Sequence, residues 1–317
     1  MKKHYSHFHD RTGEEIKNNQ GLKMKIIVYN GSDDILVKFE DGYKVKTQYG
    51  LFKRGNINNP NFRGANFKDR TGETKQNNHG TTMQIIAYRG NNDIDVEFQD
   101  EHHHVKNTTY SNFKRGNVKN PYDKDLFGVG YLGVGKYKCK RDNEENLSEV
   151  YETWMGMLRR CYFDNIKFPA YYDKCIVCEE WHNFQNFAEW YEENKYPVNE
   201  RLHIDKDILY PNCHIYSPET CILTPQRINM LFSNKPNSRG LPNGIFKIKS
   251  GYRAEYQGIK IGRYSTLDEA YDAYSTAKEN NIKEVADEYK NIIPKKLYDA
   301  LYAYKVDINN DKNYKVS

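Results

Sequence analysis

The sequence predicts an α+β fold with several domains: two small all-β repeats at the N-terminus, a helical middle domain containing a ββα unit, and a C-terminal three-stranded sheet packed on a helix. A duplicated segment predicts the two repeats, and two amphipathic helical patterns predict the middle domain. Three short strand patterns before a capped helix predict the C-terminal domain. The length of 317 residues agrees with more than one domain. The expected boundaries are 1–61 and 62–122 for the repeats, 123–137 for a glycine-rich linker, 138–236 for the middle domain, 237–308 for the C-terminal domain and 309–317 for a tail.

An internal repeat occupies the first third of the chain. Residues 10–41 and 69–100 share 18 of 32 residues without a gap, and residues 49–60 and 110–121 share 8 of 12. Two copies are fewer than a stacked repeat fold needs, so we expect two separate modules. In each copy a short apolar strand (MKIIVY or MQIIAY) precedes an alternating one (DILVKF or DIDVEF), which is typical of a small curled sheet or barrel.

Both copies end in the sequence Phe-Lys-Arg-Gly-Asn. Lys53 and Arg54 in the first copy, and Lys114 and Arg115 in the second, could contact phosphates, although a glycine turn with solvated basic neighbours is the simpler interpretation. We expect the duplicated module to bind DNA or a protein. The second copy also contains three histidines at 102–104, and because adjacent strand residues point to opposite faces we expect an exposed edge there rather than a metal site.

The middle domain begins with two helical patterns. Apolar residues recur at three- and four-residue spacing over 145–163 and over 181–194, and we assign both stripes to the core. The preceding segment 123–137 contains two Gly-x-Gly pairs. It lacks the strand, the helix and the third glycine of a phosphate-binding loop, so we expect a linker or a flexible entry to the domain.

The segment RLHIDKDILYPNCHIYS, residues 201–217, combines charged and apolar residues. We expect a strand over 202–209, a turn at Pro211-Asn212 and a return strand over 214–217. Thr224-Pro225 then suits a helix cap followed by a first-turn proline. This order, a hairpin and then a short helix, defines the ββα unit.

Asp205 and Asp207 are two residues apart, so on a strand both would point to one face and could share Mg²⁺ or Mn²⁺. We expect His203 to point to the other face unless the strand bends. The alternative is that Asp205, Lys206 and Asp207 form local ion pairs in a hairpin that orients the domain.

Three strand patterns precede a helix in the C-terminal part: 244–250, 252–257 and 259–265. Thr266 and Glu269 have the spacing of a capping box. Alternation predicts two faces for the sheet. Tyr252, Ala254, Tyr256, Ile259 and Ile261 should face the helix, and Arg253, Glu255, Gln257 and Lys260 should face away, joined by Lys247 or Lys249. Such an outward face can enter a major groove and read bases.

The distribution of charge favours a polyanionic partner. The formal net charge is +5, but residues 235–263 contain seven basic residues, from Lys235 to Arg263, and one acid, Glu255. No segment approaches the length of an apolar membrane span, and the N-terminus lacks the apolar core of a signal peptide. We therefore expect the six cysteines to be reduced thiols in a cytoplasm.

The sequence YRAEY, followed by IKIGRYSTLDEAYDAY, resembles the DNA-binding domain of plant ethylene-response factors (ERF). That resemblance implies a sheet in the major groove of double-stranded DNA, with Arg253, Glu255, Gln257 and Lys260 on its outer face; Lys247, Lys249 and Arg263 complete the predicted DNA-binding set. Phe246 and Ile248 replace arginines of that family, and Lys260 replaces a tryptophan. DNA binding is therefore implied, and the target sequence is not.

A wider resemblance covers about 128–308. The motifs TWMGMLRRCY, EWHNFQNFAEWY, IDKDIL and YSPETCILTPQRIN are similar to phage-encoded proteins of the HNH or homing-endonuclease type. The resemblance implies a ββα unit with one divalent metal, with His203 as the general base, Asp205 and Asp207 as metal ligands, and Asn229 closing the site. It also implies a phage protein in a bacterial host cell. The adjacent histidines and spaced asparagines of the strong HNH signature are missing, which leaves an active nuclease and an inactive DNA binder both open.

Cys175 and Cys178 have the spacing of a zinc-binding pair. A tetrahedral site would need Cys213 and Cys221, or a histidine such as His182, His203 or His214. Cysteines packed in a small core are commoner, so we do not expect structural zinc.

Three hypotheses follow. The first is a DNA-binding protein of the homing-endonuclease type that nicks or cuts DNA with a divalent metal. The second is a sequence-specific DNA-binding regulator without catalytic activity. The third is an adaptor whose N-terminal repeats bind a protein.

Overall fold

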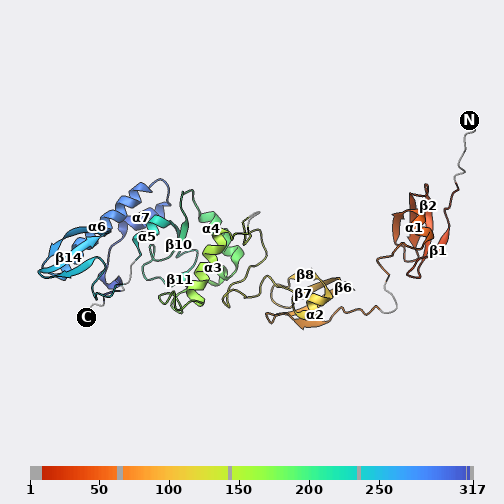
Figure 1. The fold of residues 1–317 in the computed structure, drawn as a ribbon, viewed down its shortest axis with the longest axis horizontal. Coiled ribbons are helices and arrows are strands. Elements are labelled where there is room, and N and C mark those ends of the chain that lie inside the picture. Colours follow the sequence, from red (N-terminus) through yellow and green to blue (C-terminus); the bar gives the residue numbers. More distant parts are fainter. Residues whose placement is uncertain (1–8, 63–66, 142–144, 234–236, 312, 315–317) are drawn as a thin grey trace, which may run out of the picture. The chain divides into compact units, whose positions relative to one another are not determined.

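The computed structural model describes residues 9–62, 67–141, 145–233, 237–311 and 313–314. It confirms an α+β chain, in which several small antiparallel sheets alternate with short helices (Figure 1). In the described part of the chain, no helix is both long and apolar enough to cross a membrane. Lys235, part of the predicted basic run, lies outside the described residues.

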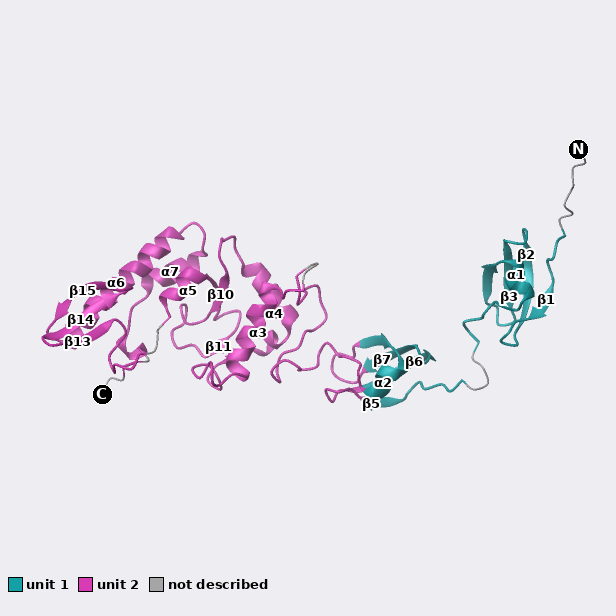
Figure 2. Ribbon diagram, viewed as in Figure 1, with its two compact units in different colours: residues 1–75, 83–97, 105–115 teal, residues 76–82, 98–104, 116–317 magenta. Residues whose placement is uncertain are grey.

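The chain divides into two compact units (Figure 2). One comprises residues 1–75, 83–97 and 105–115, and the other comprises residues 76–82, 98–104 and 116–317. Asp123 explains why a turn of the second repeat belongs to the larger unit. Its carboxylate accepts hydrogen bonds from Asn77 Nδ2 at 2.7 Å and from Thr81 Oγ1 at 2.6 Å.

Each repeat is a four-stranded antiparallel meander that ends in a short helix. The all-β prediction missed this helix, in which Phe52 or Phe113 is fully buried. In the first copy it covers a core that includes Met24 and Val37. The elements are β1 (Glu15–Lys17), β2 (Lys23–Tyr29), β3 (Ile35–Phe39), β4 (Lys44–Thr47) and α1 (Tyr49–Lys53), then β5 (Thr74–Gln76), β6 (Thr82–Gly90), β7 (Asp93–Phe98), β8 (Val105–Thr108) and α2 (Tyr110–Arg115).

The histidine run follows β7. His102 and His103 are exposed, as predicted. The His102 ring stacks on Tyr122, with 3.7 Å between ring centroids.

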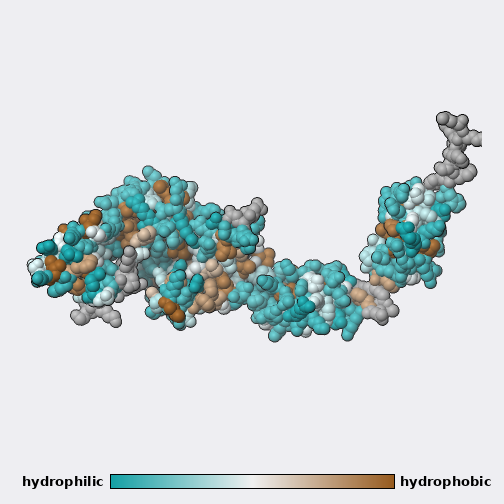
Figure 3. Space-filling view, viewed as in Figure 1, coloured by the Kyte–Doolittle hydropathy of each residue, from teal (hydrophilic) through white to brown (hydrophobic). Residues whose placement is uncertain are grey.

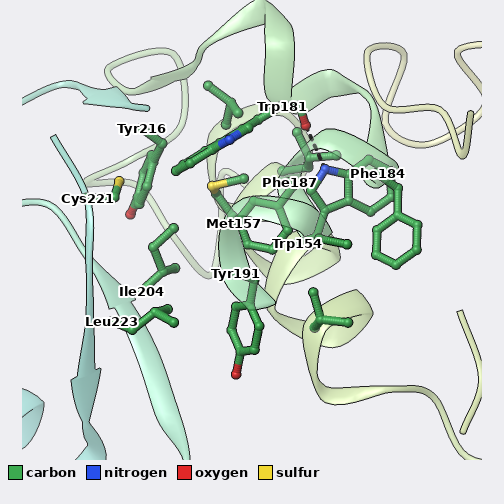
Figure 4. Close-up of a cluster of buried hydrophobic side chains, with 14 of the residues drawn as sticks. Trp154, Met157, Trp181, Phe184, Phe187, Tyr191, Ile204, Tyr216, Cys221 and Leu223 are labelled. Atoms are coloured by element: carbon green, nitrogen blue, oxygen red, sulfur yellow. Dashed lines mark hydrogen bonds between the residues drawn. The ribbon is translucent and has the colours of Figure 1, made fainter. Parts of the chain in front are cut away.

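The middle domain packs α3 (Glu149–Tyr162) against α4 (Phe184–Asn194), as the two helical patterns predict. A short 3₁₀ helix, η1 (Glu179–His182), precedes α4. Trp154 and Trp181 are fully buried between them, and Trp154 Nε1 donates a hydrogen bond to the Trp181 carbonyl at 2.7 Å (Figure 4). Both stripes therefore belong to the core, as expected.

The glycine-rich segment is not a flexible linker, so that prediction is wrong. Tyr131 N donates to the His182 carbonyl, and Phe184 N donates to the Tyr131 carbonyl, both at 2.9 Å. Gly130 lies so close to the core that a Cβ there would come within 2.5 Å of Leu158 Cδ1. A Cβ at Gly133 would lie 2.2 Å from Asn183 Oδ1. These glycines are required because the segment packs directly on α3 and on the start of α4.

The strand β9 (Ile176–Val177) lies between α3 and η1. Four short elements follow α4: the strands β10 (Leu202–Asp205), β11 (Ile215–Tyr216) and β12 (Ile222–Pro225), and the helix α5 (Gln226–Leu231). β10 pairs antiparallel with β12, and β11 pairs in parallel with β9. The return strand of the ββα unit is therefore β12, and the predicted pairing of 202–209 with 214–217 is wrong. A two-residue strand such as β11 has too few residues to show a sequence pattern.

The C-terminal part contains the predicted antiparallel sheet, β13 (Ile245–Ile248), β14 (Gly251–Tyr256) and β15 (Ile259–Tyr264). The 22-residue helix α6 (Leu267–Glu288) covers it and begins with the predicted capping box of Thr266 and Glu269. The helices α7 (Lys295–Ala303) and η2 (Ile308–Asn310) follow.

Helix α6 contributes to two cores. Its first half packs Ala270 and Tyr274 against Ile245 of the sheet. Its second half packs Ile282 against Ile228 of α5 and residues of α7. The expected boundary between 236 and 237 therefore lies inside one compact unit, and one helix joins the ββα unit to the sheet.

Candidate nucleic-acid interface

The ββα unit places its apolar residues on one side. Ile204 of β10 and Leu223 of β12 lie opposite each other in the ladder, and both point into the core of the middle domain (Figure 4). His203 and Asp205 alternate with the buried Leu202 and Ile204, so they share the other face of the strand. The expectation that His203 points away from Asp205 is therefore wrong.

Asp205 ends β10 and caps the turn that follows. Its Oδ1 accepts hydrogen bonds from the backbone N–H of Asp207 at 2.9 Å and of Ile208 at 2.8 Å. Burial raises the pKa of the Asp205 carboxyl above its ordinary value of 3.8, although these two hydrogen bonds act in the opposite direction. One oxygen of this predicted metal ligand is thus already used by the backbone.

Lys206 is the buried charge of this segment. Only 4% of its side chain is exposed. Its Nζ donates to Asp207 Oδ1 at 2.7 Å and to the Cys213 carbonyl oxygen, and it lies 5.6 Å from the centre of the Tyr216 ring. Burial alone would lower the pKa of Lys206, but the hydrogen bond and charge of Asp207 raise it above its usual value.

These contacts do not fit the predicted two-aspartate magnesium site. An ion of this kind takes six oxygen ligands, including free carboxylate oxygens. Asp207 is paired with an ammonium group, and Asp205 holds the turn. Among the described residues, no three His, Cys, Asp or Glu side chains are placed to hold a metal ion together. The geometry agrees in part with the alternative: Lys206 and Asp207 form a local ion pair, whereas Asp205 accepts backbone hydrogen bonds.

The two other predicted catalytic residues are placed as follows. Burial lowers the pKa of His203, and its Nε2 is buried without a hydrogen-bond partner. Asn229 lies half-buried on α5, which begins after Pro225. Thr224 belongs to β12 and its side chain caps nothing, contrary to the prediction.

All cysteines of the middle domain except Cys213 pack in its core or against it. Cys175 and Cys221 are buried there, and all six cysteines are free thiols. Burial raises the pKa of Cys221 to about 12 and also raises that of Cys178.

The C-terminal sheet presents a row of side chains across its three strands. Arg253 lies opposite Phe246 on one side and opposite Arg263 on the other. The next residue along β14, Ala254, is fully buried against the helix, so this row faces away from it. The prediction that Arg253 lies on the outer face is confirmed.

Phe246 stands where the resembled family has an arginine. Its ring contacts two arginines of this chain. The guanidinium carbons of Arg239 and Arg253 lie 4.5 Å and 4.9 Å from the centre of its ring. These are cation–π distances. Arg253 Nε also lies 2.8 Å from Glu255 Oε1. Arg239 belongs to the predicted basic run 235–263 but not to the predicted DNA-binding set, because it precedes the strands.

Glu255 and Lys260 form a second pair of opposed residues on β14 and β15. Lys247, Lys249, Lys260 and Arg263 are exposed. Lys247 lies opposite Tyr252 in the ladder and its Nζ is 4.1 Å from the centre of that ring. Tyr252 packs on the core beneath α6, so Lys247 is on the helix side of the sheet and its expected outward orientation is wrong. Arg253, Arg263 and Lys260 therefore outnumber the one acid, Glu255, in the paired positions of the outer face. In the view of Figure 3, hydrophobic residues lie scattered among hydrophilic ones over this sheet.

The expected orientations of Ile261 and Gln257 are wrong, and Ile259, although it lies opposite the helix-side Tyr256, is not covered by the helix. A register shift between Ala254 and Glu255 leaves Ile261 as an extra residue of β15. Ile261 is 36% exposed and Ile259 is 72% exposed, so neither is buried under the helix. Gln257 lies in the turn with a φ of 49°, and its Nε2 donates to Asn281 Oδ1 of α6 at 3.1 Å. Its side chain therefore points toward the helix.

No protein-family model matches this sequence, and no curated protein or solved structure is significantly similar to it. The resemblances to HNH nucleases and to ethylene-response factors therefore stay predictions.

Proposed function

We propose that this protein binds double-stranded DNA through the outer face of the sheet β13–β15 and that it does so without cutting DNA. The observation that carries the proposal is the pairing of Arg253 with Arg263 across β14 and β15. Like charges directly opposite each other destabilise a sheet. A phosphate or a guanine placed between them would relieve that repulsion, since either presents acceptors to two guanidinium groups.

The composition of this face supports DNA over a small anion. A two-stranded or three-stranded sheet is narrow enough to enter a major groove. Arg253, Lys260 and Arg263 can donate to phosphates or bases, and Glu255 can accept from a cytosine amine. The ββα unit and its hairpin then act as a scaffold, and α6 connects them to the sheet.

Binding is tested with Arg253→Gln/Arg263→Gln and fluorescence anisotropy on mixed-sequence duplexes. We expect affinity to fall by about 30-fold or more, because each of the two guanidinium contacts contributes about 1–3 kcal/mol. Lys290→Gln/Lys296→Gln removes the same charge from exposed positions outside the sheet and should bind nearly as the wild type does. Equal affinity of the arginine variant and the wild type would contradict the proposal.

Cleavage is tested separately on supercoiled DNA with Mg²⁺ or Mn²⁺. We expect no nicking by the wild type. Nicking that disappears in Asp205→Ala/Asp207→Ala would show that the hairpin is a metal site and would restore the nuclease hypothesis.

A further inference from the structure

Comparison of the two N-terminal repeats shows which identical residues make the same contacts in both copies. Tyr49 and Tyr110 accept hydrogen bonds from Arg11 and Arg70 at 2.8 and 2.7 Å. Both tyrosines also donate to a glutamate of their own repeat. Phe52 and Phe113 are fully buried. Most residues that are identical in the two copies are therefore explained by the fold of the module.

The Lys-Arg pair is not explained in this way. Lys53 and Arg54, like Lys114 and Arg115, are identical in the two copies and exposed in both. Within the described residues, none of the four side chains has a hydrogen-bond or ion-pair partner. Other basic side chains of the modules differ between copies or have partners: Lys25 pairs with Glu15 at 3.0 Å.

The backbone after each pair is fixed in one geometry. Gly55 and Gly116 follow the two arginines with φ values of 70° and 74°. A Cβ at Gly55 would lie 2.9 Å from Asn19 Oδ1, and one at Gly116 would lie 2.7 Å from Asn78 Oδ1. Only glycine suits both the φ and the space. Each module therefore presents its Lys-Arg pair on an equally rigid support.

We propose that each repeat binds the phosphate backbone of double-stranded DNA through its Lys-Arg pair, independently of the sheet β13–β15. An exposed ammonium group and an exposed guanidinium group at successive positions can each donate to a phosphate oxygen. A duplex offers the same charged groups along its whole length, about one negative charge per 1.7 Å of helix axis. Two copies of one surface on one chain suit such a repeating partner and raise the effective concentration of the second contact.

A role in helix stability is the alternative, because Lys53 and Lys114 lie in the last turns of α1 and α2. Basic residues there interact favourably with the helix dipole, by about 0.3–1 kcal/mol. That role requires positive charge near the helix end and no partner. Binding measurements and thermal unfolding of the same variants separate the two roles.

The test replaces all four residues by glutamine in the full chain and measures affinity for a mixed-sequence duplex of about 60 base pairs at several salt concentrations. Each lost phosphate contact should reduce the slope of log K against log salt by about 0.9, so we expect a decrease of about 2 to 3.6. The charge-retaining variant, with Lys→Arg and Arg→Lys at both pairs, should keep the slope of the wild type.

The matched control is Lys17→Gln/Lys38→Gln/Lys75→Gln/Lys119→Gln. These four lysines are exposed, lie two in each repeat and are not shared between the copies, so the net charge changes equally. An equal loss of slope in this control would overturn the proposal, because it would show an effect of total charge alone. A four-glutamine variant that binds as the wild type does, with or without a lower melting temperature, would overturn it as well.

Arg253→Gln/Arg263→Gln separates this inference from the proposed function. If the sheet variant keeps its affinity while the four-glutamine variant loses slope, the sheet proposal fails and the repeat proposal holds. The reverse result would overturn the repeat proposal alone.

Discussion

The ammonium group of Lys206 donates a hydrogen bond to the carboxylate of its sequence neighbour Asp207 at 2.7 Å, and the lysine side chain is buried while the aspartate is half exposed. In the predicted nuclease site a divalent cation would lie between Asp205 and Asp207. In the structure, the ammonium group of Lys206 supplies the positive charge beside Asp207 instead. The hairpin can therefore be stable without any bound ion.

Replacing Lys206 by methionine should destabilise the protein by about 1–3 kcal/mol. The substitution keeps most of the side-chain volume but leaves the Cys213 carbonyl without its donor and Asp207 without its counter-ion. Urea unfolding measures the change. Lys247→Met, at an exposed position, should shift the midpoint little; equal effects of both substitutions would contradict the buried ion pair.

Asp205 gives a prediction that depends on pH. Burial raises the pKa of Asp205 in the folded state, so the ionised carboxylate lowers the free energy of unfolding at neutral pH. This destabilisation disappears as the pH falls through the raised pKa and below the ordinary value of 3.8, because the carboxyl is then neutral. Asp205→Asn keeps an oxygen that can accept from Asp207 N and Ile208 N but carries no charge. We expect its urea midpoint at pH 7 to equal or exceed that of the wild type, with the difference vanishing in acid.

The alanine substitution at the same position is the control. Asp205→Ala removes the acceptor for both backbone N–H groups and should cost about 1–3 kcal/mol. If asparagine were as destabilising as alanine at pH 7, the capping role of Oδ1 would be wrong.

Phe246 should matter for DNA binding more than for stability. Phe246→Ala removes the ring beside Arg239 and Arg253, and each exposed cation–π contact contributes about 0.5–1 kcal/mol. We expect a several-fold loss of duplex affinity in anisotropy, because the two guanidinium groups lose their fixed positions. Phe246→Tyr keeps the ring and should bind as the wild type does. Unchanged affinity of the alanine variant would show that the ring does not organise these arginines for binding.

Two glycines should respond to alanine in opposite directions. Gly130→Ala would place a methyl group 2.5 Å from Leu158 Cδ1 and 3.2 Å from the Trp154 ring, so we expect a loss of about 1–3 kcal/mol. Gly156 lies inside α3, where a Cβ would meet only Arg160, at 3.8 Å. Gly156→Ala should therefore stabilise the protein by about 0.5–1 kcal/mol through helix propensity. Thermal unfolding of both variants checks the pair; a tolerated Gly130→Ala would mean that the segment is loosely attached.

Local patterns in the sequence predicted the elements whose signals are local. The two helical stripes, the three C-terminal strands and the capping box of Thr266 and Glu269 follow from spacing alone, and the structure contains them. The buried Ala254 and the outward Arg253 follow from alternation. These features depend on residues within one element or one turn.

The errors arose where a distant segment decides the outcome. Ile261 is an extra residue of β15 only with respect to its partner strand, so alternation within the strand could not reveal it. The partner of β10 is β12 because β11 pairs with β9, which lies before α4 in the sequence. Glycines that permit close packing, such as Gly130, look the same in a sequence as glycines of a mobile linker.

The same reasoning applies to Lys206. A lysine between two aspartates in a polar segment is normally solvated, and its burial depends on Tyr216 and on the carbonyl of Cys213. None of these contacts is visible in the spacing of charges. The metal site was predicted from residue types alone. In the fold, Asp205 and Asp207 already have partners within the protein.

Helix α6 supplies side chains to both the sheet core and the core around α5. Division of the chain between residues 236 and 237 would therefore not give two fragments that each fold independently. The N-terminal fragment would expose Ile228 and its neighbours, and the C-terminal fragment would carry the opposite half of that broken interface beside the sheet β13–β15. A recombinant fragment that contains this sheet should therefore retain α5, or replace the apolar residues in the second half of α6 by polar ones.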